Sequence, residues 1–128
     1  MPTIKAKITF LSEKEGGRPQ MPEVNKASRY MPHLVVQDPD IRNAIIRNTK
    51  LHSNELIEEY LGVAFVSGPT PIIPDKEGVY ELALMYYPKV SYEKLIKGAT
   101  FTVREGAHVV GFGEVSVTFP PKTGPVES

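Results

Sequence analysis

The chain of 128 residues contains no cysteine and no tryptophan, and it lacks long apolar runs. Without cysteine it can form no disulfide, no iron–sulfur or zinc-thiolate centre and no cysteine nucleophile. Its longest apolar run, residues 82–87, is far shorter than the ~20 residues that span a bilayer. No glycine is followed by lysine, so the phosphate-binding loop GxxxxGK[ST] cannot occur. We therefore expect no membrane helix and no nucleotide binding or hydrolysis.

The charge is balanced over the whole chain but not along it. Fifteen Lys and Arg offset fifteen Asp and Glu, yet residues 1–50 hold nine against five and residues 51–128 hold six against ten. The resulting excesses of +4 and −4 permit an anionic partner, although asymmetry of this size more often has no specific meaning. Charged and apolar residues alternate at the N-terminus, unlike the apolar stretch of a secretory signal, so we expect a cytoplasmic protein.

Short stretches whose apolar residues recur with a period of two predict a mainly β protein. The clearest is residues 4–10, where apolar residues alternate with Lys5, Lys7 and Thr9. Further strands are expected at residues 33–37, 62–67, 79–87, 99–104 and 108–119. Six such strands around one core favour a closed antiparallel β-barrel, because closure removes exposed sheet edges.

Two features interrupt the strand pattern. The apolar phase slips near Gly111 and Gly113, which predicts a bulge or bend. Residues 38–61 instead carry helix signals: Asp38 and Ser53 as caps, each followed by an apolar stripe. We therefore predict one barrel domain over residues 1–119 with a helical insertion at about 38–61. The proline-rich residues 120–128 are expected to form a flexible tail.

No motif for catalysis or metal binding stands out. His33, His52 and His108 are isolated in sequence, and neither HExxH nor GxSxG occurs. Asp38 and Asp40 fit helix capping better than an acid–base pair. We expect no cofactor, no metal and no enzymatic activity.

Two stretches of the sequence give a more specific signal of family than the composition does. Residues 6–18 (AKITFLSEKEGGR) lead to RYMPH at residues 29–33, and residues 98–115 read GATFTVREGAHVVGFGEV. Both, in this order, resemble the C-terminal β-barrel domain (domain III) of translation elongation factor Tu, here as a stand-alone domain. That domain contains an EEGGR-like turn, a YRPQF-like strand and FxIREGxxTVGxGxV. The resemblance covers about residues 4–37 and 62–118 and implies a non-catalytic barrel.

In that family the barrel contacts the T stem of aminoacyl-tRNA, the GTPase domain and the nucleotide-exchange factor. The resemblance carries its conserved turn residues over to Arg18, Glu105 and Gly106. It also carries three contact positions over with altered residues: an Arg to Met31, a Gln to His33, and a Lys or His to Tyr87.

These residues lead to two hypotheses. The first is a non-catalytic binding module for an unknown protein partner, linked to translation by the resemblance. The alternative is a protein that binds tRNA or another RNA arm, although the pI near 6.8 lacks the basic excess usual for such domains. For either function we predict a binding site with Arg18, Arg29, His33, Glu105 and Gly106, and no membrane or nucleotide partner.

Overall fold

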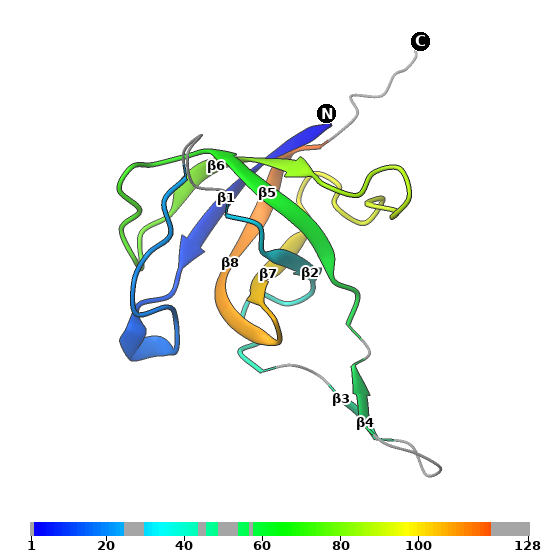
Figure 1. The fold of residues 1–128 in the computed structure, drawn as a ribbon, viewed down its shortest axis with the longest axis horizontal. Helices are drawn as coiled ribbons and strands as arrows, with labels where there is room; N and C mark the ends of the chain where they lie inside the picture. The colour runs from blue at the N-terminus through cyan, green and yellow to red at the C-terminus, as the bar shows by residue number, and fades with distance from the viewer. Residues whose placement is uncertain (1, 25–29, 44–45, 49–53, 57, 119–128) are drawn as a thin grey trace.

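The computed structural model describes residues 2–24, 30–43, 46–48, 54–56 and 58–118. Six strands form the predicted closed antiparallel barrel, in the order β1-β6-β5-β2-β7-β8 (Figure 1). The strands are β1 (Thr3–Phe10), β2 (His33–Val36), β5 (Leu61–Ser67), β6 (Gly78–Leu84), β7 (Thr100–Glu105) and β8 (His108–Val117). The mainly β fold class is therefore confirmed, and each barrel strand matches one expected from the period-two pattern.

The barrel interior is filled by the inward-facing residues of every strand. In β1 the alternation predicts the buried face correctly, because Ile4, Ala6, Ile8 and Phe10 are all at most 1% exposed. Four aromatic rings meet at one end of this core, where Phe10 lies between 5.8 and 6.1 Å from the ring centres of its neighbours. These neighbours are Tyr30, Phe65 and Tyr80. Such tilted and edge-to-face packing is favoured over flat stacking.

The predicted irregularity in the last strand is also confirmed. Between β7 and β8, Val103 pairs with Gly111 and Arg104 with Val109, so Val110 is an extra residue on β8. Such a bulge bends its strand and increases the local twist. The sequence signal was the change of apolar phase near Gly111, and the bulge is its structural cause.

The helices predicted within residues 38–61 are wrong for the described residues. Here β3 (Ile46–Asn48) and β4 (Asn54–Leu56) pair antiparallel in a separate two-stranded sheet. Asp38 forms a local turn, accepting a hydrogen bond from the Asp40 N–H at 2.8 Å, rather than capping a helix. Helices of one or two turns are unstable unless an apolar face packs on the core. Leu61, the last residue of the predicted helical segment, instead begins strand β5.

The described helical structure consists of η1, a single 3-10 turn at Glu13–Glu15. Within the described ranges, therefore, no helix has the length and apolarity needed to cross a membrane. The tail predicted at residues 120–128 lies outside the described residues.

Strands β1 and β8 approach each other closely at Gly113, so a larger residue there should lower the stability of the protein. A Cβ added there would overlap Lys7 O and lie 2.9 Å from both Ile8 Cγ1 and Phe101 Cζ. We expect Gly113→Ala to lower the free energy of unfolding by about 1–3 kcal/mol, because backbone and core must shift. Chemical denaturation measures this, with the exposed neighbour Glu114→Ala as control, expected within about 0.5 kcal/mol of wild type. Equal stability of the two variants would contradict the close approach.

Candidate functional site

Arg18 and Glu105, both predicted as binding residues, form an ion pair at one end of the barrel. Arg18 follows η1 and Glu105 ends β7, and Arg18 Nε lies 2.9 Å from Glu105 Oε2. The Tyr30 hydroxyl donates a hydrogen bond to the same carboxylate oxygen at 2.5 Å. The Arg18 guanidinium also lies 5.4 Å from the centre of the Tyr30 ring. Both charges therefore have partners within the protein.

Of the other two predicted residues, the structure describes Gly106 but not Arg29. Gly106 occupies the β7–β8 turn with φ of 62°, a conformation that favours glycine because it has no Cβ. It directly follows Glu105, so this turn adjoins the ion pair. Arg29 lies outside the described residues, and its role stays a prediction.

His33 faces outward from the barrel wall. It begins β2, where its neighbour Leu34 points into the core, and it pairs in register with Gly62 of β5. The His33 ring centre lies 5.9 Å from that of Tyr60, at 65° to it. His33 thus contributes to an outer surface, whereas the Tyr30–Glu105 contact lies at the barrel end.

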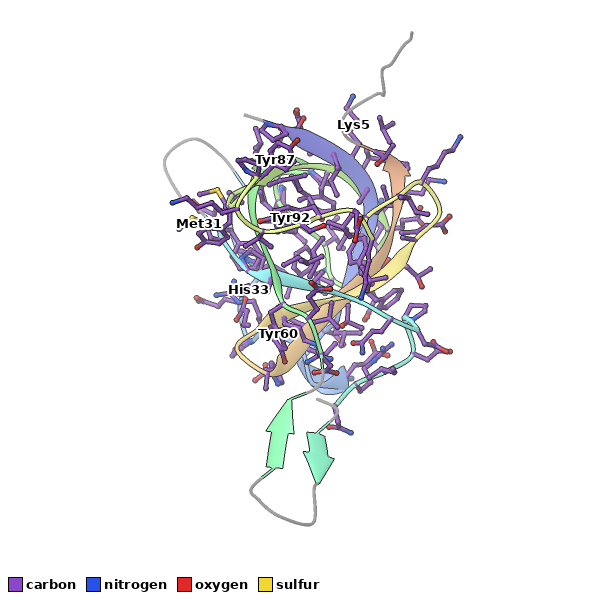
Figure 2. All side chains as sticks on the ribbon, turned by 90° about the vertical axis from the view of Figure 1, so that its right-hand side faces the viewer. Lys5, Met31, His33, Tyr60, Tyr87 and Tyr92 are labelled. Carbon is purple, nitrogen blue, oxygen red and sulfur yellow. The ribbon has the colours of Figure 1, made fainter. Side chains whose placement is uncertain are left out.

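The three contact positions that the resemblance carries over with altered residues lie on the same side of the barrel (Figure 2). They are Met31, His33 and Tyr87, of which Met31 is 51% and Tyr87 44% exposed. Tyr86 is 54% exposed and its ring lies over Gly62, where an added Cβ would be 2.8 Å from Tyr86 Cδ2. We define the tyrosine face as the outer surface made by Met31, His33, Tyr60, Tyr86 and Tyr87.

The loop carrying the two exposed tyrosines is fixed to the barrel. The buried Tyr92 hydroxyl donates a hydrogen bond to Gly62 O at 2.7 Å and accepts one from the Tyr86 N–H at 3.0 Å. Leu95, in the same loop, is buried in the core. The exposed side chains therefore project from an ordered backbone, which reduces the entropy lost on binding.

A buried arginine network covers the outer face of β7. Arg104, which is fully buried, pairs with Glu58 through Arg104 Nη2 and Glu58 Oε2 at 2.7 Å and through Nη1 and Oε1 at 3.0 Å. Arg104 also donates hydrogen bonds to Thr102 Oγ1, the Tyr60 hydroxyl and Gln37 Oε1 at 2.7–3.0 Å. A buried charge is tolerated only when paired and hydrogen-bonded in this way.

This network, here called the arginine clamp, joins the two ends of the segment that was predicted to be helical. Gln37 directly follows β2, where the chain leaves the barrel, while Glu58 and Tyr60 precede β5, where it returns. Gln37 Nε2 also donates a hydrogen bond to Glu58 Oε2 at 3.2 Å. Both ends are thus held against one guanidinium.

A cavity of about 230 Å³ lies beside the clamp, and it is lined by Val35, Val36, Gln37, Glu58, Glu59, Leu61 and Lys94. Gln37 and Glu58 already accept hydrogen bonds from Arg104. Glu59 Oε1 lies 3.2 Å from Lys94 Nζ in an exposed pair. The polar side chains that line the cavity are thus engaged within the protein.

Among the residues that the structure describes, no group of three or more His, Asp or Glu side chains could hold a metal ion. No protein-family model and no curated protein significantly matches this chain. The candidate site therefore rests on its own geometry.

The motifs singled out Arg18 and Glu105, whose binding role stays a prediction, but gave no sign of two contacts between residues distant in sequence. Tyr30 lies 75 residues from Glu105, and Glu58 lies 46 residues from Arg104. Arg104 belongs to the REG motif. A charged residue inside an expected strand was the available signal that Arg104 has a structural role. Nothing in the sequence marks Glu58 as its partner.

Removing the carboxylate of Glu58 should strongly destabilise the protein. We expect Glu58→Gln to cost about 3–5 kcal/mol, because Arg104 would stay buried without a countercharge. Replacing both residues, with Glu58→Leu and Arg104→Met, should recover most of that loss. The exposed Glu59→Gln, whose pair with Lys94 is solvated, should cost under about 1 kcal/mol. Denaturation of the double variant and of its two single changes, Glu58→Leu and Arg104→Met, gives the coupling energy, and a value near zero would contradict the clamp.

Buried tyrosines predict a loss of stability at alkaline pH. Burial, with the hydrogen bond to Glu105, raises the pKa of Tyr30 well above its usual 10, and burial raises the pKa of Tyr80 to about 12. The unfolded chain loses these protons near pH 10, so stability is complete below pH 10 and falls as pH rises towards 12. Denaturation at pH 9 and pH 11 measures the loss. Tyr30→Phe should show a smaller loss, and an unchanged loss would contradict this assignment.

Proposed function

We propose that this chain is a non-catalytic binding module whose tyrosine face docks a protein partner. The likeness of its motifs to domain III of elongation factor Tu links the proposal to translation. The cytoplasmic location expected from the sequence is part of the same proposal. Catalysis is not proposed, because the polar groups of the described site hold one another in place.

The observation that carries the proposal is the chemistry of the tyrosine face. Met31 and Tyr87 occupy positions where the family pattern has basic residues, and both are substantially exposed. Tyr86, next to Tyr87 in the chain, adds a third exposed side chain, and its ring lies over Gly62. Tyrosine and methionine are enriched in the cores of protein–protein interfaces, where large side chains bury area at low entropic cost. An RNA backbone would instead require cations here.

The contacts of three arginines also favour a protein over RNA. Arg18 is paired with Glu105, and Arg104 is buried in the clamp. Arg42 lies 5.1 Å from the centre of the Phe112 ring and donates a hydrogen bond to Pro39 O at 2.5 Å. Contact with phosphate would have to displace these partners. RNA binding remains the second candidate, because the tyrosines could stack on unpaired bases.

Site-specific photo-crosslinking in the native cells tests the two candidates. A photoreactive phenylalanine analogue replaces Tyr86 or, as control, Val79, which is 57% exposed and pairs with Lys7 of β1. We expect a discrete polypeptide adduct from position 86, absent from position 79 and weakened by Met31→Ser. Adducts that ribonuclease removes would favour RNA instead. No adduct from position 86, or the same adduct from both positions, would refute a docking role for the face.

A further inference from the structure

The loop that joins β5 to β6 borders a small pocket, whose volume is about 220 Å³. Figure 1 shows this loop leaving β5 and returning to the start of β6. The pocket is lined by Pro69, Pro71, Ile73, Lys76, Glu77 and Tyr80. The exposed tyrosines of the tyrosine face follow the other end of β6, at Leu84, so the pocket is a separate site.

Tyr80 is the buried residue in the wall of this pocket. Its ring centre lies 5.4 Å from that of Phe65 and 5.8 Å from that of Phe10, in the aromatic end of the core. Two glycines leave room for the ring. An added Cβ would lie 2.8 Å from Tyr80 Cε2 at Gly68 and 3.3 Å from Tyr80 Cε1 at Gly78. The ring is therefore held in place by the core and by both strand ends.

The hydroxyl of Tyr80 is a buried polar group that lacks a partner. The residue is only 1% exposed, yet within the described part of the chain no hydrogen bond reaches this hydroxyl. Burial alone raises its pKa, with no contribution from a hydrogen bond. By contrast, the buried Tyr92 hydroxyl makes two hydrogen bonds. An unsatisfied buried hydroxyl is costly and rare in native proteins, so a group entering the pocket would be stabilised by pairing with it.

We propose that this pocket binds a phenol, that is, an aromatic ring that carries a hydroxyl group. A hydroxyl can both donate and accept a hydrogen bond, so a phenolic hydroxyl is a suitable partner for that of Tyr80. The volume suits one substituted ring, since an apolar cavity of about 150 Å³ is enough to bind benzene. Proline rings, here Pro69 and Pro71, pack well against aromatic rings, as in the aromatic grooves that bind proline-rich peptides.

The two charged side chains of the pocket favour a neutral aromatic ligand. Lys76 and Glu77 form no ion pair with the described residues. An ammonium group is attracted to the face of an aromatic ring, which favours an aromatic ligand over an aliphatic one. Because the charges of Lys76 and Glu77 are opposite, a charged ligand would be attracted by one and repelled by the other. A phenol is uncharged at neutral pH, since it titrates near pH 10.

Titration of the intact protein with p-cresol and with toluene, followed by the NMR shifts of backbone amides, tests the proposal. The two compounds differ by a single hydroxyl group. We expect p-cresol to bind about tenfold more tightly than toluene, with the largest shifts at residues 76–80. Tyr80→Phe should abolish this difference by weakening the binding of p-cresol alone. The control Tyr86→Phe, on the tyrosine face, should change neither affinity.

A third probe, N-acetyltyrosinamide, identifies the source of the phenol. Binding as tight as that of p-cresol would show that the pocket accepts the tyrosine side chain of a polypeptide. Binding at least tenfold weaker would show that the pocket takes a free phenolic compound. In both cases the ligand group is a phenol, as proposed.

Stability provides a check that requires no ligand. Tyr80→Phe should be at least as stable as the wild type, because the hydroxyl that it removes has no partner. The control Tyr92→Phe should be less stable, since it loses two hydrogen bonds. Denaturation of both variants measures this, and a clear loss of stability in Tyr80→Phe would overturn the proposal, because the hydroxyl would then already be paired.

Three binding results would also overturn the proposal. The first is no measurable binding of p-cresol, and the second is equal binding of p-cresol and toluene to the wild type. The third is equal binding of p-cresol to the wild type and to Tyr80→Phe. Shifts centred on residues 85–87 would place the ligand on the tyrosine face and refute the pocket.

Discussion

The burial of one guanidinium determines how the outside of this barrel is arranged. Arg104 points away from the core, yet it has no exposed surface, because Gln37, Glu58 and Tyr60 close over it. Removing a cation from water costs several kcal/mol, and the ion pair with its hydrogen bonds offsets that cost only in this geometry. The pair therefore contributes more to fixing the position of its segments than to net stability.

The barrel core could be predicted from the sequence because it obeys a local rule. Side chains alternate across a strand, so the pattern Ile4, Ala6, Ile8, Phe10 determines which face is buried before any partner strand is known. The bulge near Gly111 was predictable for the same reason, since an extra residue reverses the alternation. Neither prediction required contacts that are distant in sequence.

The segment between β2 and β5 could not be predicted in this way. Its apolar spacing fits a helix, but Glu58 and Tyr60 are held by Arg104, which lies more than forty residues later in the chain. Tertiary contacts of this kind override weak helical preference in segments too short to fold alone. The same limit applies to the Arg18–Glu105 ion pair, because the motifs that contain these two residues do not indicate their shared contact with Tyr30.

Three arginine side chains are held by partners within the protein. Arg18, Arg104 and Arg42 are engaged by Glu105, Glu58 and the Phe112 ring, and the net charge of zero adds no long-range attraction for a polyanion. For the binding module proposed above, affinity would depend on short-range contacts and on how well the surface is ordered before binding. Tyr92 orders the loop beneath the exposed tyrosines, and Arg104 holds both ends of the segment between β2 and β5. Both act through hydrogen bonds of buried side chains, and Tyr92 is itself part of the core, so the order of the exposed loop depends on core packing.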